Sequence, residues 1–334
     1  PDDPDFYTTD AFTDYALRYL DEYGSEEQPF FLYLAYTAPH YPLHARPEDI
    51  EKYRNRYLDG WDAIRKERYL RMIEMGLIDP ELKMSPRDEN AQNWDDVPNK
   101  EEWALKMAVY AAMVDRMDQN IGRILAKIRE LDEEENTIVM FLSDNGGCAE
   151  QVNLTPDIPP GPVNSYRTVD LEWANAQNTP FRKFKRWDHE GGISTPFIVH
   201  WPAVIGEGGT VTNQPGHIID VMATVLDIAD VGYPSSYHGR NVLPLKGKSL
   251  LPVFKGKHRE GHDMLFWQFG RARAVRKGDW KLVDFGKQQW ELYNMKNDRT
   301  EMHNHADRHP DLVVELEHAW NEWAQDCNVQ YEFD

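Results

Sequence analysis

An acid and an amide directly follow a strongly apolar run of the sequence. Residues 137–143 read Thr-Ile-Val-Met-Phe-Leu-Ser, and Asp144, Asn145, Gly146 and Gly147 come next. Such a run is typical of a strand covered on both faces in a parallel α/β sheet, whose ligands bind beyond the carboxyl ends of the strands. There the oxygens of Asp144 and Asn145 would suit a hard cation, and the glycines would allow a positive φ and close approach. The same tripeptide is also a common turn.

A histidine follows a second apolar run. Residues 29–36, Pro-Phe-Phe-Leu-Tyr-Leu-Ala-Tyr, are too apolar for an edge strand and predict a central one. Thr-Ala-Pro then leads to His40. Because the carboxyl ends of parallel strands share one edge of a sheet, His40 is expected on the same edge as Asp144. A single histidine there is more often structural, but this convergence favours a function.

A cluster of cations marks a third region. Residues 181–186, Phe-Arg-Lys-Phe-Lys-Arg, contain four cations in a chain whose formal net charge is −20. Taken alone, such a cluster usually belongs to a solvated face that balances nearby acids. Here residues 187–193, Trp-Asp-His-Glu-Gly-Gly-Ile, follow it, and an apolar strand is predicted at 197–201. The cluster is therefore interpreted as an anion-binding loop that enters the sheet.

Composition narrows the classes of fold and partner. With 334 residues, 41% of them hydrophobic, the chain can bury a large core and is expected to form one large and one smaller domain. Its negative charge argues against nucleic acid or an anionic membrane as partner, although local cations can still attract an anionic substrate. No run approaches the about 18 apolar residues of a membrane span. Cys148 and Cys327 are too few for a disulfide framework and have no zinc-site spacing.

Hydrophobic periodicity predicts four helical segments and two long loops. The helical segments are residues 10–23, 48–76, 99–131 and 218–229. Asn99 and Glu102 form a capping-box pattern at the start of the third, whose apolar stripe contains Met107, Tyr110, Ala111, Val114, Met117, Ile121, Ile124, Ile128 and Leu131. The loops are residues 79–99 and 148–180. So long a loop as the second, beside a ligand site, is more often a substrate-facing wall than filler.

The chain changes character after about residue 258. Short strands are predicted at residues 265–269, 272–276, 280–283 and 290–293. A last helix begins near Pro310, which is favoured at the first helical position. These elements predict a small antiparallel sheet with one helix packed on it. The spacing of His303, His305 and His309 would permit a metal site, although a solvated polar loop is the commoner interpretation.

Together and in this order, the motifs resemble those of the type I sulfatases, which use a formylglycine. The matching segments are Ala38–His40, Ser143–Gly147, Asn178–Arg182, Glu190–Ile193, Pro196 and Gly247–Pro252. The resemblance implies an α/β, alkaline-phosphatase-like fold with a mixed, mainly parallel sheet between helices. The catalytic α/β domain would cover residues 1–258 and be incomplete at its N-terminus. A small antiparallel-sheet-plus-helix subdomain would cover residues 259–334.

The resemblance also implies a function, that of an arylsulfatase-like sulfuric ester hydrolase. Asp144 and Asn145 resemble two ligands of the family's single divalent cation, usually Ca²⁺. Lys185, five residues before Glu190, resembles the lysine that contacts the sulfate, and His40 resembles the histidine that binds the ester oxygen and assists the leaving group. These roles suit the chemistry, because negative charge develops on the leaving oxygen as the ester bond breaks.

The sequence departs from the family in one respect. Sulfatases carry a Cys- or Ser-x-Pro-x-Arg segment, whose Cys or Ser becomes the formylglycine, after an Asp-Asp metal pair. These 334 residues contain no Cys- or Ser-x-Pro-x-Arg segment and hence no Asp-Asp pair that precedes one, and the upstream lysine and histidine of the sulfate pocket are missing too. The chain is therefore expected to correspond to the C-terminal two-thirds of a sulfatase. By itself it should be catalytically inert and bind its metal poorly.

Two other functions stay open. Phosphatases and phosphodiesterases of the same superfamily bind two zinc ions and have a histidine where this chain has Asn145, which favours one hard cation instead. A degenerate sulfatase-like protein would bind sulfated glycans through the basic loop without catalysis. The expected partner is a sulfate-ester small molecule or a sulfated glycan.

Overall fold

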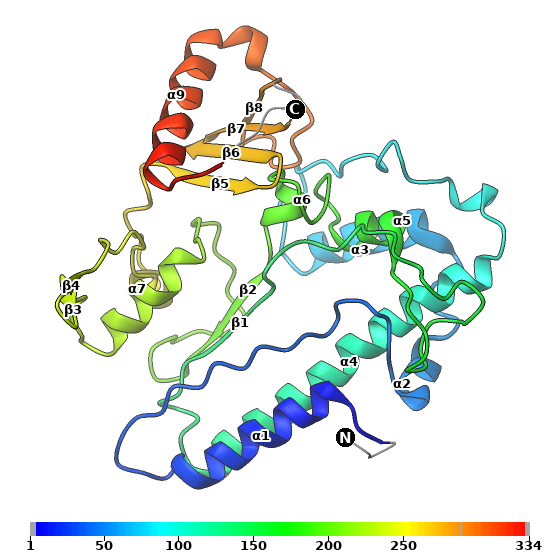
Figure 1. Ribbon diagram of the computed structural model, residues 1–334, viewed down its shortest axis with the longest axis horizontal. Helices are drawn as coiled ribbons and strands as arrows, with labels where there is room; N and C mark the ends of the chain where they lie inside the picture. Colours follow the sequence, from blue (N-terminus) through cyan, green and yellow to red (C-terminus); the bar gives the residue numbers. More distant parts are fainter. Residues whose placement is uncertain (1–4, 287–288, 331–334) are drawn as a thin grey trace. The chain divides into compact units, whose positions relative to one another are not determined.

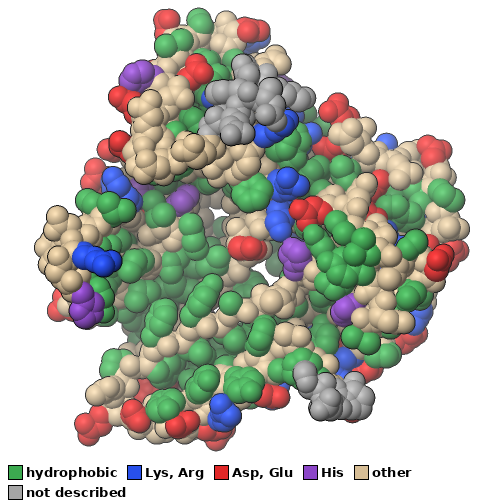
Figure 2. All heavy atoms as spheres, in the orientation of Figure 1, with side chains coloured by type: hydrophobic (Ala, Val, Ile, Leu, Met, Phe, Trp, Pro, Cys, Tyr) green, Lys and Arg blue, Asp and Glu red, His purple; other side chains and the backbone are tan. Residues whose placement is uncertain are grey.

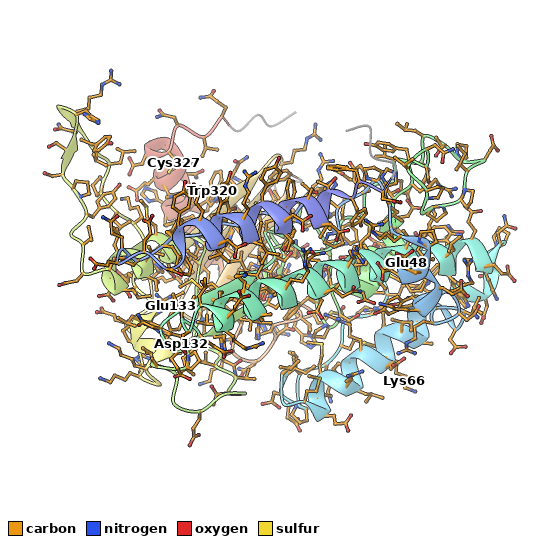
Figure 3. The ribbon with its side chains drawn as sticks, turned by 90° about the horizontal axis from the view of Figure 1, so that it is seen from below. Glu48, Lys66, Asp132, Glu133, Trp320 and Cys327 are labelled. Atoms are coloured by element: carbon orange, nitrogen blue, oxygen red, sulfur yellow. The ribbon has the colours of Figure 1, made fainter. Side chains whose placement is uncertain are left out.

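The helices of the N-terminal half follow the periodicity of the sequence. The computed structural model describes residues 5–286 and 289–330 (Figure 1). The predicted segments 10–23 and 99–131 correspond to α1 (Thr8–Tyr23) and α4 (Lys100–Glu130). The predicted segment 48–76 is divided into α2 (Pro47–Tyr53) and α3 (Gly60–Glu74), and a 3₁₀ turn, η1 (Trp94–Asp96), lies before α4. Both α1 and α2 pack against α4, and Figure 3 shows α1 and α4 side by side.

The chain divides into two units. The first comprises the residues up to Glu134, Leu142–Pro196 and the residues from Phe266 onward, and the second comprises Glu135–Phe141 and Phe197–Leu265. The predicted domain boundary between residues 258 and 259 stays a prediction. Among the helices that the structure describes, none is both long and apolar enough to cross a membrane.

Tryptophans form the centre of the first unit. Trp61 on α3 is fully buried and meets three other indole rings edge-on, with ring centroids 4.7 to 5.5 Å away: Trp94, Trp103 and Trp173. Aromatic rings in such arrangements add to the free energy of burial. Trp173 lies on α5 (Asp170–Gln177), a buried helix within the stretch that the sequence predicts as loop. The predicted loop is therefore wrong over these eight residues, since so short a helix shows no lasting periodicity.

The buried face of α4 is rotated from the predicted stripe in the first half of the helix. Ala108, Val109 and Ala112 are buried there, whereas Val114 is 37% exposed. Residues 103–114 are all apolar except Lys106, so periodicity alone does not select a face. Small alanines allow the neighbouring helices to approach closely, and this packing decides the face. Farther along, the predicted burial of Ile124 and Ile128 is confirmed.

The start of α4 also differs from the prediction. Asn99 has a left-handed backbone, with φ 58°, and its side chain makes no capping hydrogen bond. An N-cap residue normally has an extended backbone, which directs its side chain at the first free N–H groups of the helix. The side chain of Glu102 pairs with Arg167 instead. The predicted capping box is therefore wrong.

Residues 29–36 do not form the predicted central strand. Their side chains alternate between exposed and half-buried, with Phe31 76% and Tyr33 82% exposed. This alternation is that of an extended chain with one packed face. Among the described residues no strand pairs with this segment through its backbone, and without such a partner no sheet forms. Figure 2 shows exposed hydrophobic side chains over this segment and α1, which contribute Phe31, Tyr33, Tyr15, Tyr19 and Tyr23.

In the second unit, β1 (Val139–Leu142) and β2 (Phe197–His200) pair in a two-stranded sheet. Both strands are confirmed, but their predicted full burial is wrong, since β1 is half-buried and Ile198 is 59% exposed. An apolar run thus identified the strands without revealing how much of each face is covered. The other elements of this unit are α7 (Ile219–Ile228), β3 (Ser236–Tyr237), β4 (Arg240–Asn241) and α8 (Leu251–Phe254).

A buried carboxylate organises the second unit. Asp220 in the first turn of α7 is fully buried, and its oxygens accept hydrogen bonds from Arg259 at 2.9 Å and His262 at 2.6 Å. The backbone N–H of Lys248 donates to the same carboxylate at 2.8 Å. Asp220 thereby holds the segment Gly247–Pro252, which has a structural role here.

The C-terminal region has the predicted architecture. β6 (Ala272–Lys277) pairs antiparallel with β7 (Trp280–Phe285), and β7 pairs antiparallel with β8 (Glu291–Asn294). β5 (Leu265–Phe269) completes the four-stranded sheet beside β6, and α9 (Pro310–Asp326) packs against β6 and β7 (Figure 1). The indole of Trp320 on α9 (labelled in Figure 3) donates to the carbonyl of Trp267 at 3.0 Å. A 3₁₀ turn, η2 (Ala306–Arg308), precedes α9.

The C-terminal histidines lie before α9. The rings of His305 and His309 are 6.1 Å apart, and both pack against Trp280. His303 is exposed. Among the described residues no three His, Cys, Asp or Glu side chains are grouped for metal binding.

Candidate functional site

The structure brings His40 and Lys185 together. Nζ of Lys185 lies 3.2 Å from Nε2 of His40, and Nδ1 of His40 lies 2.8 Å from the carbonyl oxygen of Tyr41. A carbonyl oxygen only accepts hydrogen bonds, so Nδ1 carries the ring proton and Nε2 accepts from the lysine ammonium. His40 is exposed and Lys185 is partly exposed. An anion can therefore reach both side chains from solvent.

Backbone hydrogen bonds tie the Asp144–Asn145 turn to the loop that carries Lys185. The N–H of Gly146 donates to the carbonyl of Gly192 at 3.0 Å, and the N–H of Lys185 donates to the carbonyl of Gly147, also at 3.0 Å. Hydrogen bonds therefore link the turn that carries Asp144 and Asn145 to the loop that carries Lys185. His40 joins this arrangement through its contact with Lys185.

The glycines after Asn145 are required by close packing. A Cβ atom on Gly146 would lie 1.8 Å from the carbonyl oxygen of Gly191, far inside van der Waals contact. The predicted close approach is therefore confirmed. The predicted positive φ is wrong, because neither Gly146 nor Gly147 has a left-handed backbone. Glycine is therefore needed at this turn because a side chain would not fit, and not because the backbone is left-handed.

Asp144 and Asn145 present oxygen atoms that suit a hard cation. The Asp144 carboxylate is exposed, and within the described part of the chain no hydrogen bond or ion pair engages it. Nδ2 of Asn145 donates to the carbonyl of Gly146 at 2.8 Å, which leaves Oδ1 available. Calcium takes six to eight oxygen ligands, so these two side chains fit such an ion but would supply only part of its coordination.

Of the four clustered cations, Lys185 is the one that faces His40. Lys183 is buried and donates to Asp88 at 2.8 Å. Arg182 donates to the carbonyl of Glu301 at 2.7 Å. These two cations thus anchor the loop to other segments. The prediction of anion binding by this cluster therefore now concerns Lys185 and the exposed Arg186 next to it.

The backbone on both sides of Lys185 is left-handed. Lys183 has φ 68° and Arg186 has φ 80°, values that side chains other than glycine seldom adopt. Each such residue costs about 1 to 3 kcal/mol, and the conformation persists only where the surroundings fix it. The anchored cations and the turn at Gly146 provide that fixation.

A buried ion cluster holds the end of the loop, where α6 (Glu190–Ile193) begins. Lys281 on β7 is fully buried, and its Nζ lies 2.8 Å from Oε1 of Glu190 and 2.9 Å from Oε1 of Glu301. The N–H of Glu190 donates to Glu301 at 2.8 Å. Burial alone would raise the pKa of Glu190, but the ammonium of Lys281 outweighs it and lowers that pKa. Glu190 is therefore charged and paired.

Two further ionisable residues of this loop are buried behind the site. His189 is 2% exposed, and its Nε2 lies 3.0 Å from Oε2 of Glu291. Burial would raise the pKa of Glu291, but hydrogen bonds from His189 and Tyr293 lower it to about 2. Burial raises the pKa of Asp188 to about 7. His189 supports the loop and cannot reach a substrate.

Comparison with family models shows the family to which the chain belongs. Residues 1–231 match the family model described as Sulfatase. The chain belongs to the sulfatase family. Residues 181–325 also match the model described as N-sulphoglucosamine sulphohydrolase, C-terminal.

Two curated sulfatases are similar along most of this chain. An uncharacterized sulfatase of Schizosaccharomyces pombe is 34% identical over 351 residues, which cover 97% of this chain and 62% of that protein. An arylsulfatase of Klebsiella aerogenes is 30% identical over 270 residues, covering 76% and 58%. The sulfatase chain therefore spans 62% and 58% of the length of these two relatives.

Solved structures confirm the alkaline-phosphatase-like α/β fold expected from the sequence. Ps i-CgsB in complex with k-i-k-neocarrahexaose has a TM-score of 0.66 at 22% identity, covering 98% of this chain and 57% of that one. BT4656 in complex with its substrate D-glucosamine-2-N,6-O-disulfate has a TM-score of 0.61 at 20% identity, covering 96% and 69%. A phosphonate monoester hydrolase from Silicibacter pomeroyi has a TM-score of 0.56 at 17% identity, covering 96% and 60%.

Sequence reasoning missed three residues at the candidate site: Tyr41, Glu150 and Tyr166. The Tyr41 ring lies 4.4 Å from the His40 ring, and its hydroxyl donates to Oε2 of Glu150 at 2.6 Å. Tyr166 lies 6.1 Å from Tyr41. Glu150 and Tyr166 come from the predicted loop 148–180, whose role as a substrate-facing wall stays a prediction. Adjacency to His40 is the signal that could have identified Tyr41, whereas Glu150 lies in no motif.

Proposed function

We propose that the protein containing this chain hydrolyses sulfate esters. The observation that carries the proposal is the 3.2 Å contact between Nζ of Lys185 and Nε2 of His40, both open to solvent. Membership of the sulfatase family supports the same reaction. Hydrolysis of a sulfate ester requires a cation that binds the sulfate group and an acid that protonates the oxygen of the departing alcohol. A lysine beside an imidazole ring can supply both.

In the proposed reaction Lys185 binds a non-bridging oxygen of the sulfate group. Nε2 of His40, once protonated, donates to the ester oxygen and passes its proton to the leaving alcohol. Gly146 and the buried pair of Lys281 and Glu190 hold the loop so that Lys185 keeps this position. The carbonyl of Tyr41 fixes the ring orientation through Nδ1.

Asp144 and Asn145 are proposed as ligands of a divalent cation, Ca²⁺ by family resemblance. When bound, such an ion supplies positive charge that polarises a sulfate oxygen. The nucleophile is expected to be a formylglycine made from a Cys- or Ser-x-Pro-x-Arg segment, which these 334 residues do not contain. The chain alone is therefore expected to show no turnover of an aryl sulfate.

We further propose a sulfated carbohydrate as the substrate class. Two proteins of similar fold were solved with neocarrahexaose and with glucosamine disulfate. The match of residues 181–325 to the N-sulphoglucosamine sulphohydrolase model supports the same class.

The test is an assay of the native gene product that contains this chain. It should hydrolyse 4-nitrophenyl sulfate and sulfated monosaccharides in preference to 4-nitrophenyl phosphate. Lys185→Met and His40→Asn should each lower kcat/KM by about 10² or more, because each removes a charge-stabilising or proton-donating group. Lys66→Met, at an exposed position on α3, is the control (Figure 3).

Two outcomes would overturn the proposal. Preferential hydrolysis of phosphate esters with two bound zinc ions would assign the protein to the phosphatase branch of the superfamily. Binding of sulfated glycans without turnover, by a gene product lacking the formylglycine segment, would make it a glycan-binding relative.

A further inference from the structure

A carboxylate that the proposed hydrolysis does not use borders the candidate site. Glu150 accepts a hydrogen bond from the hydroxyl of Tyr41 at 2.6 Å, and the Tyr41 ring lies against His40. The hydrogen bond from Tyr41 is the main cause that lowers the pKa of Glu150, and the charges of Lys185 and Arg186 lower it further. Glu150 is therefore a carboxylate anion close to the two cations of the loop.

One oxygen of this carboxylate remains open. Oε2 accepts hydrogen bonds from the Tyr41 hydroxyl at 2.6 Å and from the Cys148 thiol at 3.5 Å. Oε1 has its nearest cation in Arg186, at 3.8 Å, and accepts no hydrogen bond from any residue that the structure describes. The side chain is 28% exposed, so the carboxylate is accessible from solvent. Arg186 is 60% exposed, and water and salt weaken its attraction.

Tyr41 fixes the open oxygen in place. Its ring lies between His40, at 4.4 Å between centroids, and Tyr166, at 6.1 Å. The hydrogen bond from Tyr41 raises its own pKa to about 12, so the hydroxyl stays a donor over the physiological range. Glu150 thus has a fixed position relative to the group proposed to protonate the leaving oxygen.

We propose that Glu150, positioned by Tyr41, is a specificity residue that accepts a hydrogen bond from a hydroxyl group next to the sulfate ester. The site then prefers a singly sulfated, hydroxyl-rich sugar, and disfavours both an aryl sulfate and a sugar with a second anionic group near the ester. This inference rests on the proposed function. It deepens that function by naming which sulfate esters the site accepts.

The chemistry follows from the fixed negative charge. A carboxylate oxygen is acceptor-only, so a sugar hydroxyl satisfies it by donating, whereas an aryl ring offers no donor and leaves it unpaired. A second sulfate or carboxylate at the same place would meet like charge. Arg186 reduces this repulsion without removing it, because the pair is long and solvent-exposed.

The experiment is calorimetric titration of the 334-residue chain with four probes: inorganic sulfate, galactose 6-sulfate, 4-nitrophenyl sulfate and galactose 2,6-disulfate. Each affinity is divided by that for inorganic sulfate, which removes the general effect of charge. In Glu150→Gln the relative affinity for galactose 6-sulfate should fall about threefold to tenfold, and that for the disulfate should rise by a similar factor. Glu150→Gln preserves side-chain size at a partly exposed position, so the fold is retained.

The matched control is Asp115→Asn. Asp115 also accepts a tyrosine hydroxyl, from Tyr53 at 3.1 Å, and pairs with a lysine, Lys52 at 3.0 Å. It lies on α4 and should leave all four ratios unchanged. Lys185→Met should weaken sulfate binding by about tenfold or more and so reports on the underlying anion site.

The outcomes separate the two proposals. Sulfate binding that depends on Lys185, with ratios unchanged by Glu150→Gln, would overturn the specificity role and leave the anion site intact. Failure of the wild-type chain to bind sulfate through Lys185 would overturn the specificity role together with the anion site on this chain, whereas hydrolysis is tested separately on the native gene product. A preference of the wild type for the disulfate over the monosulfate would also overturn the specificity role.

Discussion

Nζ of Lys185 lies 3.2 Å from Nε2 of His40, although 145 positions separate the two residues in the sequence. The bond from Nδ1 of His40 to the carbonyl of Tyr41 leaves a lone pair on Nε2. Sulfate carries only acceptor oxygens. An anion that binds to both side chains therefore requires a proton on Nε2, which the free site does not have.

This relationship predicts that sulfate binding takes up a proton. Titration calorimetry in two buffers of different ionisation enthalpy should give different apparent heats, corresponding to an uptake of about one proton at most. His40→Asn should bind sulfate without the buffer dependence, and Lys185→Met should weaken binding by about tenfold or more. Equal heats in both buffers for the wild type would contradict this account of the His40 ring.

Removal of the Lys281 ammonium should destabilise the protein strongly. Lys281→Met leaves the carboxylates of Glu190 and Glu301 buried without their common counter-ion, at a cost of about 3 to 5 kcal/mol in the free energy of unfolding. Urea unfolding measures this change. The control is Lys277→Met on the adjoining strand, because Lys277 and Glu315 pair at about half exposure and should contribute less than about 1 kcal/mol. Similar losses in both variants would argue against a special role of the buried cluster.

Asp188 should make the stability depend on pH. Its pKa is about 7 in the folded chain, where burial raises it, against 3.8 as the ordinary value. Between these values the folded state keeps the proton and the unfolded state releases it, so this residue's contribution to stability falls as pH rises and then levels off.

Asp188→Asn should remove that dependence. Its unfolding free energy should exceed that of the wild type increasingly from about pH 4 to pH 7, at about 1.4 kcal/mol per unit of pKa shift, up to a few kcal/mol. Urea titrations at pH 5, 6 and 8 measure the difference. A difference that is constant with pH would show that Asp188 ionises equally in both states.

Gly146 should tolerate no side chain. Gly146→Ala places a methyl group 1.8 Å from a backbone carbonyl oxygen, which cannot move without opening the loop of Lys185. We expect a loss of about 1 to 3 kcal/mol or more, and weaker sulfate binding. Gly122→Ala in the middle of α4 meets nothing within 4 Å and should instead gain about 0.5 to 1 kcal/mol. A Gly146→Ala variant as stable as the wild type would contradict the packing described at this turn.

Local signals in the sequence account for most of the elements. The helices and the C-terminal strands have strong periodicity or turn signals between them, and all of them form. Residues 29–36 show where such reasoning ends, because a strand needs a hydrogen-bonded neighbour that its own residues do not specify. The buried face of α4 was also undetermined, since residues 103–114 are all apolar except Lys106.

The site was predictable only in part. The order of motifs singled out His40 and Lys185, which the structure brings together. Glu150 was not found, because it lies in a loop without periodicity or motif. The cluster around Lys281 was missed for a different reason: charged residues are usually exposed, and nothing local reveals that a lysine in a short strand pairs with acids far away in the chain.

The anchoring of the basic loop has a consequence for the order of events during synthesis. Glu190 and His189 leave the ribosome 91 to 111 residues before Lys281, Glu291 and Glu301, their buried partners. At translation speeds of about 5 to 20 residues per second, this interval lasts roughly 5 to 20 seconds. Throughout it Glu190 and His189 lack their buried partners, whereas Asp88 and Gly147, which hold Lys183 and Lys185, have already been synthesised. The C-terminal end of the basic loop can thus be fixed only after Lys281, Glu291 and Glu301 have been synthesised.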